Sequence, residues 1–195
     1  MLLSTKELLD IPVMSLQTGT EIAVTTHIVI DPATLHILSY ELYGNQLTET
    51  PSFLRVEDIR ELSDIGFIVD SSDVLTILDD IVVDIDSYKN PLQLDGLKVI
   101  DDHGEKLGKI ESVIMDTMTF QIEQLHVKQP LFKNFSDTNL LINRAQVLDV
   151  TKDHVVVRSA TVRANAHKSS TKQALLDAMR RPATPRPESA KSDSN

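Results

Sequence analysis

The chain contains the same sequence pattern twice, and this repeat constrains its fold more than any other feature. Residues 9–42 align with residues 94–127 without a gap at an offset of 85, and the similarity resumes further on at an offset of 88. The coinciding residues include a glycine, an aspartate that ends an apolar run, and an apolar triplet: Gly19 with Gly104, Asp31 with Asp116, and Phe67-Ile68-Val69 with Val155-Val156-Val157. A repeat of this length predicts two copies of a small domain and not the unit of a solenoid.

Each copy has the pattern of a small all-β domain. Short runs of β-branched residues alternate with turn signals such as Gln17-Thr18-Gly19-Thr20 and Asp101-Asp102-His103-Gly104, and no long helical pattern separates them. This predicts a mainly β fold of two tandem small antiparallel β-barrels. We expect strands at Pro12–Leu16, Ile22–Asp31, Leu35–Tyr43, Val56–Ile59 and Phe67–Val69, and in the second copy at Leu97–Ile100, Leu107–Met115, Phe120–Val127, Val147–Val150 and Val155–Val157.

The 195 residues divide into four segments on this basis. The two domains cover residues 1–71 and 92–162, and a basic, proline-containing flexible tail covers residues 163–195. Between the domains, residues 72–91 carry apolar side chains at roughly helical spacing with aspartates among them, which predicts a linking helix. Two smaller helical elements are also expected. Ser4 and Glu7 form a capping-box pattern ahead of a helical turn, and the tail has a short helical pattern over residues 171–181.

The motifs of both copies resemble the PRC-barrel domain, a small β-barrel first described in the photosynthetic reaction-centre H subunit. The second copy carries the G-x-x-[LI]-G-x-[IV] hairpin at Gly104–Ile110, an apolar triplet ending at Asp116, and a long strand at Phe120–Val127. The first copy departs from the pattern, because Ala23 and Thr25 stand where Gly108 and Ile110 stand. The resemblance implies a docking or assembly role without shared catalytic residues. A similar domain forms the C-terminal half of a bacterial ribosome maturation factor.

Composition and charge restrict the classes of partner. The chain has no cysteine, so neither a disulfide framework nor a thiolate metal site can form, which suits a cytoplasmic protein. No apolar run is long enough for a membrane span. The net charge is −10, and residues 1–90 hold 4 Lys+Arg against 16 Asp+Glu, a net of 4 − 16 = −12. Such a surface disfavours direct binding of nucleic acid, and a homo-oligomer is left open.

The clearest difference between the copies is the loop before the fourth strand of the second. This loop holds Leu131, Phe132, Lys133 and Phe135, whereas the first copy has a polar loop there. Exposed aromatic and basic residues together suit a protein interface or contacts with RNA. The alternative is that both phenylalanines fold back to plug the barrel end, because large apolar side chains are usually buried.

The tail provides the second candidate surface. Arg180 and Arg181 close the short helical pattern and give it a basic end that could dock on a partner, or on the acidic half of the chain itself. No catalytic, cofactor or metal site is expected. The six histidines form no metal-ligand motif, and turn chemistry explains Asp31, Asp116 and Asp101-Asp102 best.

These observations favour a non-enzymatic protein-interaction or adaptor module. The alternative is an accessory factor in RNA maturation or ribosome assembly that binds a ribosomal protein, by analogy with the maturation factor. The negative charge disfavours direct binding of RNA, but it does not disfavour binding of a basic ribosomal protein. The identity of the partner stays open.

Overall fold

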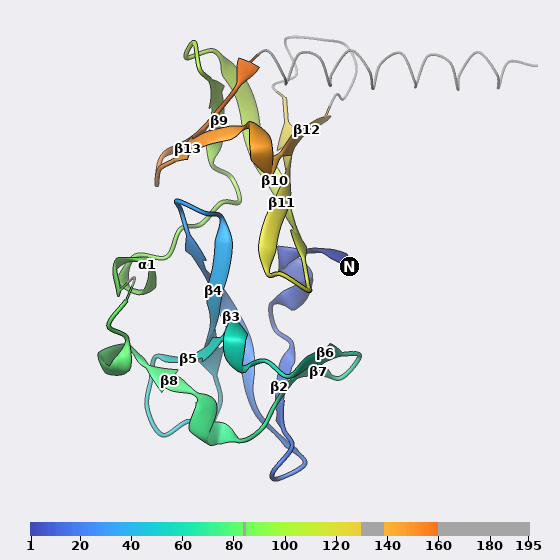
Figure 1. The fold of residues 1–195 in the computed structure, drawn as a ribbon, viewed down its shortest axis with the longest axis vertical. Coiled ribbons are helices and arrows are strands. Elements are labelled where there is room, and N and C mark those ends of the chain that lie inside the picture. The colour runs from blue at the N-terminus through green and yellow to red at the C-terminus, as the bar shows by residue number, and fades with distance from the viewer. Residues whose placement is uncertain (84, 130–138, 160–195) are drawn as a thin grey trace, which may run out of the picture.

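The computed structural model describes residues 1–83, 85–129 and 139–159 (Figure 1). The proposed docking residues Leu131, Phe132, Lys133 and Phe135 lie outside these ranges. So do Arg180, Arg181 and the short helix expected at 171–181.

The two halves of the chain have the same strand order. The first half comprises β2 (Pro12–Ser15), β3 (Thr20–Asp31), β4 (His36–Tyr43), β5 (Ser52–Arg55), β6 (Glu61–Ser63) and β7 (Gly66–Val69). The second half comprises β9 (Lys98–Asp101), β10 (Lys106–Asp116), β11 (Gln121–Lys128), β12 (Asn139–Asn143), β13 (Val147–Val150) and β14 (His154–Val157). The prediction of a mainly β fold is therefore confirmed.

Strand pairing within each half differs from the expected arrangement in two respects. Most neighbours are antiparallel, but β2 pairs with β7 in parallel, and β9 pairs with β14 in parallel. The strand order of the first half is β5-β4-β3-β2-β7-β6, and no pairing joins β5 to β6 among the described residues. Each half is thus a curved sheet with one parallel pair, not a purely antiparallel closed barrel.

The irregularities of the sheet repeat together with the sequence. The β3–β4 pair shifts register between Thr25 and His27. The β10–β11 pair shifts register between Ile110 and Ser112, which lie 85 residues after Thr25 and His27. The gapless alignment is wrong for the first strand, however, because Val13 and Val99 occupy equivalent places opposite Ala23 and Gly108.

The reason for this one-residue correction is the length of the first turn. The Gly19 amide donates to the Ser15 carbonyl at 2.8 Å, whereas the Gly104 amide donates to the Asp101 carbonyl at 2.9 Å. The β2–β3 turn therefore holds one residue more than the β9–β10 turn.

The expected linking helix is wrong. Residues 72–83 and 85–91 contain two 3₁₀ turns, η3 (Ser72–Val74) and η4 (Leu78–Asp80), a short strand, β8 (Thr76–Ile77), and a short helix, α1 (Ile85–Lys89). β8 pairs with the edge strand β5, and Tyr88 of α1 packs edge-on against Phe53 at a centroid distance of 5.1 Å. Aspartate and β-branched residues are poor helix formers, so pairing with an open sheet edge prevails over the helical spacing.

Two local predictions have different outcomes. The 3₁₀ turn η1 (Thr5–Leu8) begins as expected, and the Ser4 amide donates to the Glu7 carboxylate at 3.1 Å. The strand expected at Val56–Ile59 is wrong, because Val56–Asp58 forms the 3₁₀ turn η2 and the strand lies just before it, as β5.

The two halves join where their equivalent hairpin turns meet. His36 of β4 pairs with Gln121 of β11, its own equivalent in the repeat. The Ile37 amide donates to the Phe120 carbonyl at 2.9 Å, and the Ile122 amide donates to the Leu35 carbonyl at 3.0 Å. A pair of equivalent residues with reciprocal bonds lies on a local twofold pseudo-axis. The halves therefore form one continuous 14-stranded sheet.

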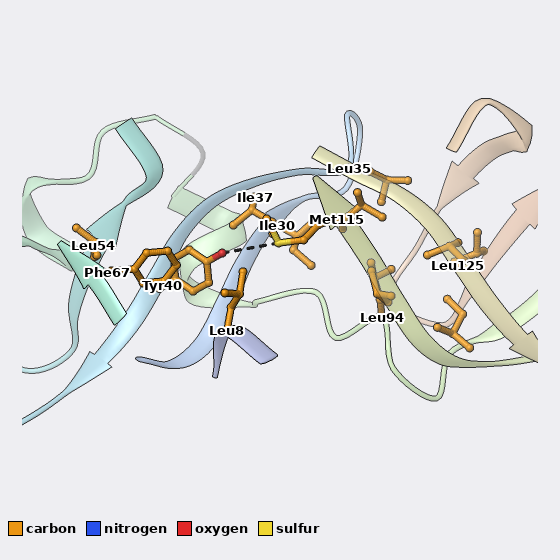
Figure 2. Packing of buried hydrophobic residues seen from close by; sticks show 14 of the residues in the cluster. Leu8, Ile30, Leu35, Ile37, Tyr40, Leu54, Phe67, Leu94, Met115 and Leu125 are labelled. Atoms are coloured by element: carbon orange, nitrogen blue, oxygen red, sulfur yellow. Dashed lines mark hydrogen bonds between the residues drawn. The ribbon is translucent and has the colours of Figure 1, made fainter. Parts of the chain in front are cut away.

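One apolar core crosses this seam. Figure 2 shows Tyr40 of the first half beside Met115 of the second, with the phenol group donating to the sulfur at 3.9 Å. Both side chains are fully buried, and burial raises the pKa of Tyr40 far above its usual value. Leu8, Ile30 and Leu94 belong to the same cluster, so the hydrophobic effect stabilises the two halves as a unit.

Candidate functional site

Two clefts lie at the seam, on opposite sides of the molecule. We call the first the seam cleft. It is lined by the N-terminal segment, by the β6–β7 hairpin and by the β10–β11 turn, with the side chains of Met1, Leu3, Glu7, Leu8, Ile11, Pro12, Ile59, Arg60, Glu61, Leu62, Ser63, Asp64, Ile65, Thr117, Met118 and Phe120. In Figure 1 the N-terminus and the β6–β7 hairpin lie on one side of the molecule and α1 lies on the other.

The second cleft, called the linker cleft, is built from the equivalent elements of the other half. Its lining includes Pro32 of the β3–β4 turn, Leu97 and the β13–β14 turn residues Thr151 and Lys152. The linker adds Asp86, Ser87 and Asn90 to this lining. Equivalent elements of the two halves therefore line both clefts, and α1 lines only the linker cleft.

Different segments cover the equivalent strand ends above the two clefts. In the second half, β1 (Leu2–Ser4) pairs with the end of β10, with Leu2 opposite Asp116 and Ser4 opposite Ile114. In the first half, α1 packs against β3. Lys6 in η1 adds a further contact across the seam, because its ammonium group donates to the Glu111 carbonyl at 3.0 Å and lies 3.4 Å from Asp95.

Side-chain hydrogen bonds fix the turns that border the seam cleft. The Asp116 carboxylate accepts from the Met118 amide at 3.0 Å. This bond and a second one from the amino group of Met1 lower the pKa of Asp116. Asp31 has the same role in the first half, accepting from the Ala33 amide at 2.9 Å. The prediction that both aspartates form turns is confirmed.

The rim of the seam cleft exposes large apolar side chains. Met118 is 80% exposed at the tip of the β10–β11 turn, and Ile65 is 60% exposed at the tip of the β6–β7 hairpin. The equivalent residues beside the linker cleft are Ala33 and Asp153. The fold alone thus does not require an apolar residue at either tip, because the other half forms the same turns without one.

The acidic side chains of the rim also differ between the two clefts. Glu61 and Asp64 line the seam cleft, and no described cation lies within 4.0 Å of either carboxylate. The guanidinium group of Arg60 is engaged by Asp70, with Nε 2.5 Å from Oδ1. At the position equivalent to Asp64, the linker cleft has Lys152. The seam cleft therefore combines apolar side chains with unpaired negative charge.

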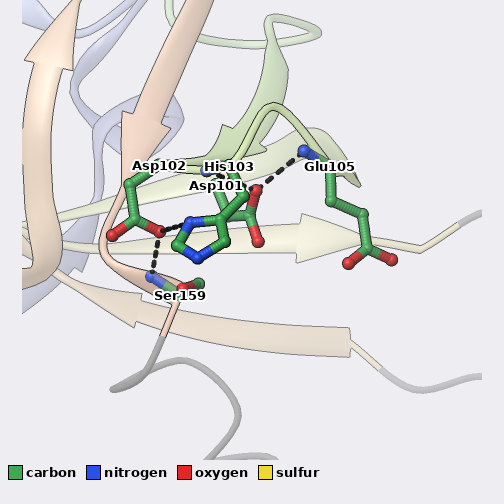
Figure 3. A network of polar contacts seen from close by, with 5 residues as sticks. All are labelled: Asp101, Asp102, His103, Glu105 and Ser159. Carbon is green, nitrogen blue, oxygen red and sulfur yellow. Dashed lines mark hydrogen bonds and ion pairs between the residues drawn. The ribbon is translucent and has the colours of Figure 1, made fainter.

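A second polar cluster lies in the β9–β10 turn (Figure 3). Asp101, Asp102 and His103 are the described acidic and histidine side chains close enough together to share a metal ion. The Asp101 carboxylate, however, accepts from the amides of His103 and Glu105 at 3.0 and 2.7 Å. The expected turn chemistry is confirmed, and the cluster carries no argument for a metal.

Asp102 has a separate structural role in this turn. Its carboxylate accepts from the Ser159 amide at 3.0 Å and lies 3.1 Å from Nδ1 of His103. Hydrogen bonding from Ser159 lowers the pKa of this carboxyl group. The bond holds the chain directly after β14 against the β9–β10 turn.

Comparison with known proteins supports the fold of the second half. The sequence profile of the PRC-barrel domain matches residues 93–163. Residues 93–163 are a PRC-barrel domain. Among solved structures, the chain is similar to RimM of Pseudomonas aeruginosa, which is described as a 16S ribosomal RNA processing protein. The identity is 16%, the match covers 81% of this chain and 97% of that chain, and the TM-score is 0.28. So loose a likeness carries no inference about function.

A search of curated proteins found no significant match. Among the described residues, no helix is long and apolar enough to cross a membrane.

The PRC-barrel domain supplies one wall of the seam cleft, through its β10–β11 turn, and the first half supplies the other. The cleft was not foreseen from the sequence, because it forms between two halves whose contact the repeat does not specify. The signal available was the pair of mismatches in aligned turns, where Met118 replaces Ala33 and Ile65 replaces Asp153.

Proposed function

We propose that the chain is a non-enzymatic docking module that binds a partner protein in the seam cleft. The observation that carries this proposal is the difference between two equivalent clefts. One exposes Met118 and Ile65, whereas the other has Ala33 and Asp153 at the same places and is lined by α1. Exposed apolar side chains beside a polar rim mark an interaction surface.

The chemistry of the described residues supports docking in preference to catalysis. A catalytic site needs a nucleophile, base or ligand cluster with convergent geometry. The carboxylates that come closest to such a cluster, Asp101 and Asp102, accept hydrogen bonds from backbone amides of their own turn or of Ser159. The walls of the seam cleft are mainly apolar, and that composition suits a protein surface.

An accessory role in RNA maturation or ribosome assembly is the alternative, and it would use the same cleft. A ribosomal protein is typically basic, so it could bind an acidic rim, whereas RNA phosphates would be repelled by Glu61 and Asp64. The two roles therefore differ in the identity of the captured protein and in the dependence of capture on nucleic acid.

Affinity capture with matched variants tests the proposal. Tagged full-length protein is isolated from native lysate after nuclease treatment, together with the double variant Ile65→Asp/Met118→Ala. Both new residues occur at the equivalent positions of the other half, so the turns accept them. Leu16→Asp is the control, because Leu16 is 56% exposed but does not line the cleft.

We expect one defined protein to be captured by the wild type and the control and reduced about tenfold with the double variant. Equal capture by all three proteins would contradict docking at the seam cleft. Loss of capture on nuclease treatment, together with recovery of ribosomal components without it, would favour the assembly role.

A further inference from the structure

We infer that the partner presents a basic amphipathic segment, whose apolar side chains fill the seam cleft and whose lysine or arginine side chains meet its acidic rim. This inference rests on the proposed function and adds the chemistry of the partner. Three properties of the cleft support it: a fixed apolar floor, exposed apolar side chains at the rim, and carboxylates that lack a described cation.

The floor of the cleft is held in place by the core. Leu3, Ile11, Ile59, Leu62 and Phe120 are partly buried and pack against the hydrophobic cluster that joins the two halves. Their remaining exposed surface faces a cleft that is already formed. A preformed apolar floor reduces the ordering cost of binding, so a short segment with a few apolar side chains can gain affinity there.

The two exposed tips add apolar surface beside such a segment, one flexible and one fixed. Met118 is unbranched and flexible, which suits contact with side chains of different shapes. Ile65 lies two residues after Ser63. The Ser63 hydroxyl accepts from the Ile65 amide at 3.4 Å and donates to the Gly66 carbonyl at 3.2 Å. The hairpin backbone is therefore fixed while the apolar side chain stays in solvent.

The charges at the rim of the cleft determine which charge the partner segment must carry. Glu61 and Asp64 extend from the β6–β7 hairpin, and the neighbouring Arg60 is neutralised by Asp70. The first 90 residues add a net charge of −12. An acidic segment would meet like charge at short range, whereas a basic one gains at each carboxylate. The linker cleft differs at the hairpin tip, where Lys152 stands at the position of Asp64, and its own carboxylates, Asp86 and Asp95, lie on the linker side.

Peptide binding to the full chain tests the inference directly. The probe is a short fluorescein-labelled peptide with leucines on one helical face and lysines on the other, and binding is followed by fluorescence anisotropy at low and high salt. Two control peptides replace every lysine with glutamate or every leucine with serine. The protein variants are Asp64→Lys and Asp149→Lys. Asp64→Lys gives the β6–β7 hairpin the lysine that the β13–β14 hairpin has at the equivalent position, Lys152. Asp149 is the equivalent of Glu61 in the second half and gives the same change of charge away from the cleft.

We expect saturable binding of the lysine peptide alone. Asp64→Lys should weaken it about three- to tenfold at low salt, and Asp149→Lys should change it less than twofold. High salt should reduce the difference between the variants. No saturable binding, equal binding of the glutamate peptide, or equal effects of the two charge reversals would overturn the inference.

Comparison with the lysate experiment separates the two claims. Capture of a partner that is lost with Ile65→Asp/Met118→Ala but kept with Asp64→Lys would leave the docking function standing and overturn the basic chemistry. Capture that none of these variants changes would overturn both.

Discussion

At the scale of single residues, small differences between equivalent positions show what each half requires. Ala23 stands where the family pattern and the second half have Gly108. A Cβ at Gly108 would lie 2.2 Å from the Lys128 carbonyl oxygen, so glycine is required there. In the first half the glycine, Gly44, directly follows the partner strand β4. A Cβ at Gly44 would lie 2.9 Å from the Ile22 carbonyl oxygen and 3.0 Å from Cα of Ala23.

Gly44→Ala should therefore lower the free energy of unfolding by about 1–3 kcal/mol, because the new methyl group meets backbone that cannot move freely. Gln129→Ala, at the equivalent position opposite Gly108, is the matched control and should be nearly neutral. Urea unfolding measures both. The double variant Ala23→Gly/Gly44→Ala reproduces the arrangement of the second half and should recover part of the loss. A Gly44→Ala protein as stable as the wild type would show that the contact is not limiting.

Asp102 gives a prediction about pH. Its pKa is lowered from 3.8 in the folded protein by hydrogen bonding from Ser159, so its stabilising contribution is complete above the unfolded value and is lost as the pH falls through the folded value. Asp102→Asn should therefore unfold at lower urea than the wild type at neutral pH, and the difference should shrink progressively as the pH falls below 3.8. Asp153→Asn is the control. A difference that persists at low pH would mean that the carboxylate charge is not the cause.

At the scale of elements, the seam depends on two hairpin turns with unusual backbone geometry. Leu35 and Phe120 both have positive φ, of 57° and 51°, at equivalent positions. This conformation costs about 1–2 kcal/mol for a residue with a side chain. At these same two residues the Leu35 and Phe120 carbonyls accept the Ile122 and Ile37 amides across the seam. The reciprocal bonds offset the cost.

Gln121 reinforces the seam from one side only. Its amide group donates to the carbonyls of Thr34 and Leu35 at 2.8 and 2.7 Å, whereas the equivalent residue is His36. Gln121→Ala should lower the free energy of unfolding by about 1–2 kcal/mol, since both carbonyls lose a donor. Gln124→Ala on the same strand serves as the control, because its side chain makes no hydrogen bond to the described residues. Equal unfolding midpoints for the two variants would contradict a role for Gln121 in the seam.

The sequence was most informative for strands and least informative for the connections between them. Alternation and turn residues located β3, β4, β10 and β11 to within a few residues. The prediction of a linking helix was wrong for a physical reason. Thr76 and Ile77 gain more by pairing with the open edge of β5 than by continuing a helix rich in aspartate. Five strands were missed, β1, β5, β6, β8 and β12. All five are too short to show a clear alternation of apolar and polar residues, and β12 directly follows residues outside the described ranges.

At the scale of the whole molecule, the common core makes the two halves one cooperative unit. All three tyrosines, Tyr40, Tyr43 and Tyr88, belong to the first half or the linker, so tyrosine fluorescence reports on that part and, through the contact of Tyr40 with Met115, on the seam. Backbone circular dichroism reports on both halves. We expect the two signals to give the same urea midpoint, as a two-state transition requires. Two separated transitions would show that the seam does not couple the halves.

The repeat predicted two domains, but it could not predict that their meeting would create the candidate site. The two halves form two equivalent clefts, and a few residue differences distinguish them. The linker forms one wall of the linker cleft, whereas Met118, Ile65 and the carboxylates of β6–β7 border the seam cleft. The functional assignment therefore depends on the relation between the halves more than on any single motif.

Site-specific photo-crosslinking in native lysate tests this assignment most directly. A photoreactive amino acid is placed at position 118 in one protein and at its equivalent, position 33, in another, and the adducts are compared after irradiation. The account predicts one discrete partner adduct from position 118, absent from position 33 and competed by the leucine–lysine peptide. Equal adducts from both positions, or an adduct from position 33 alone, would contradict docking at the seam cleft.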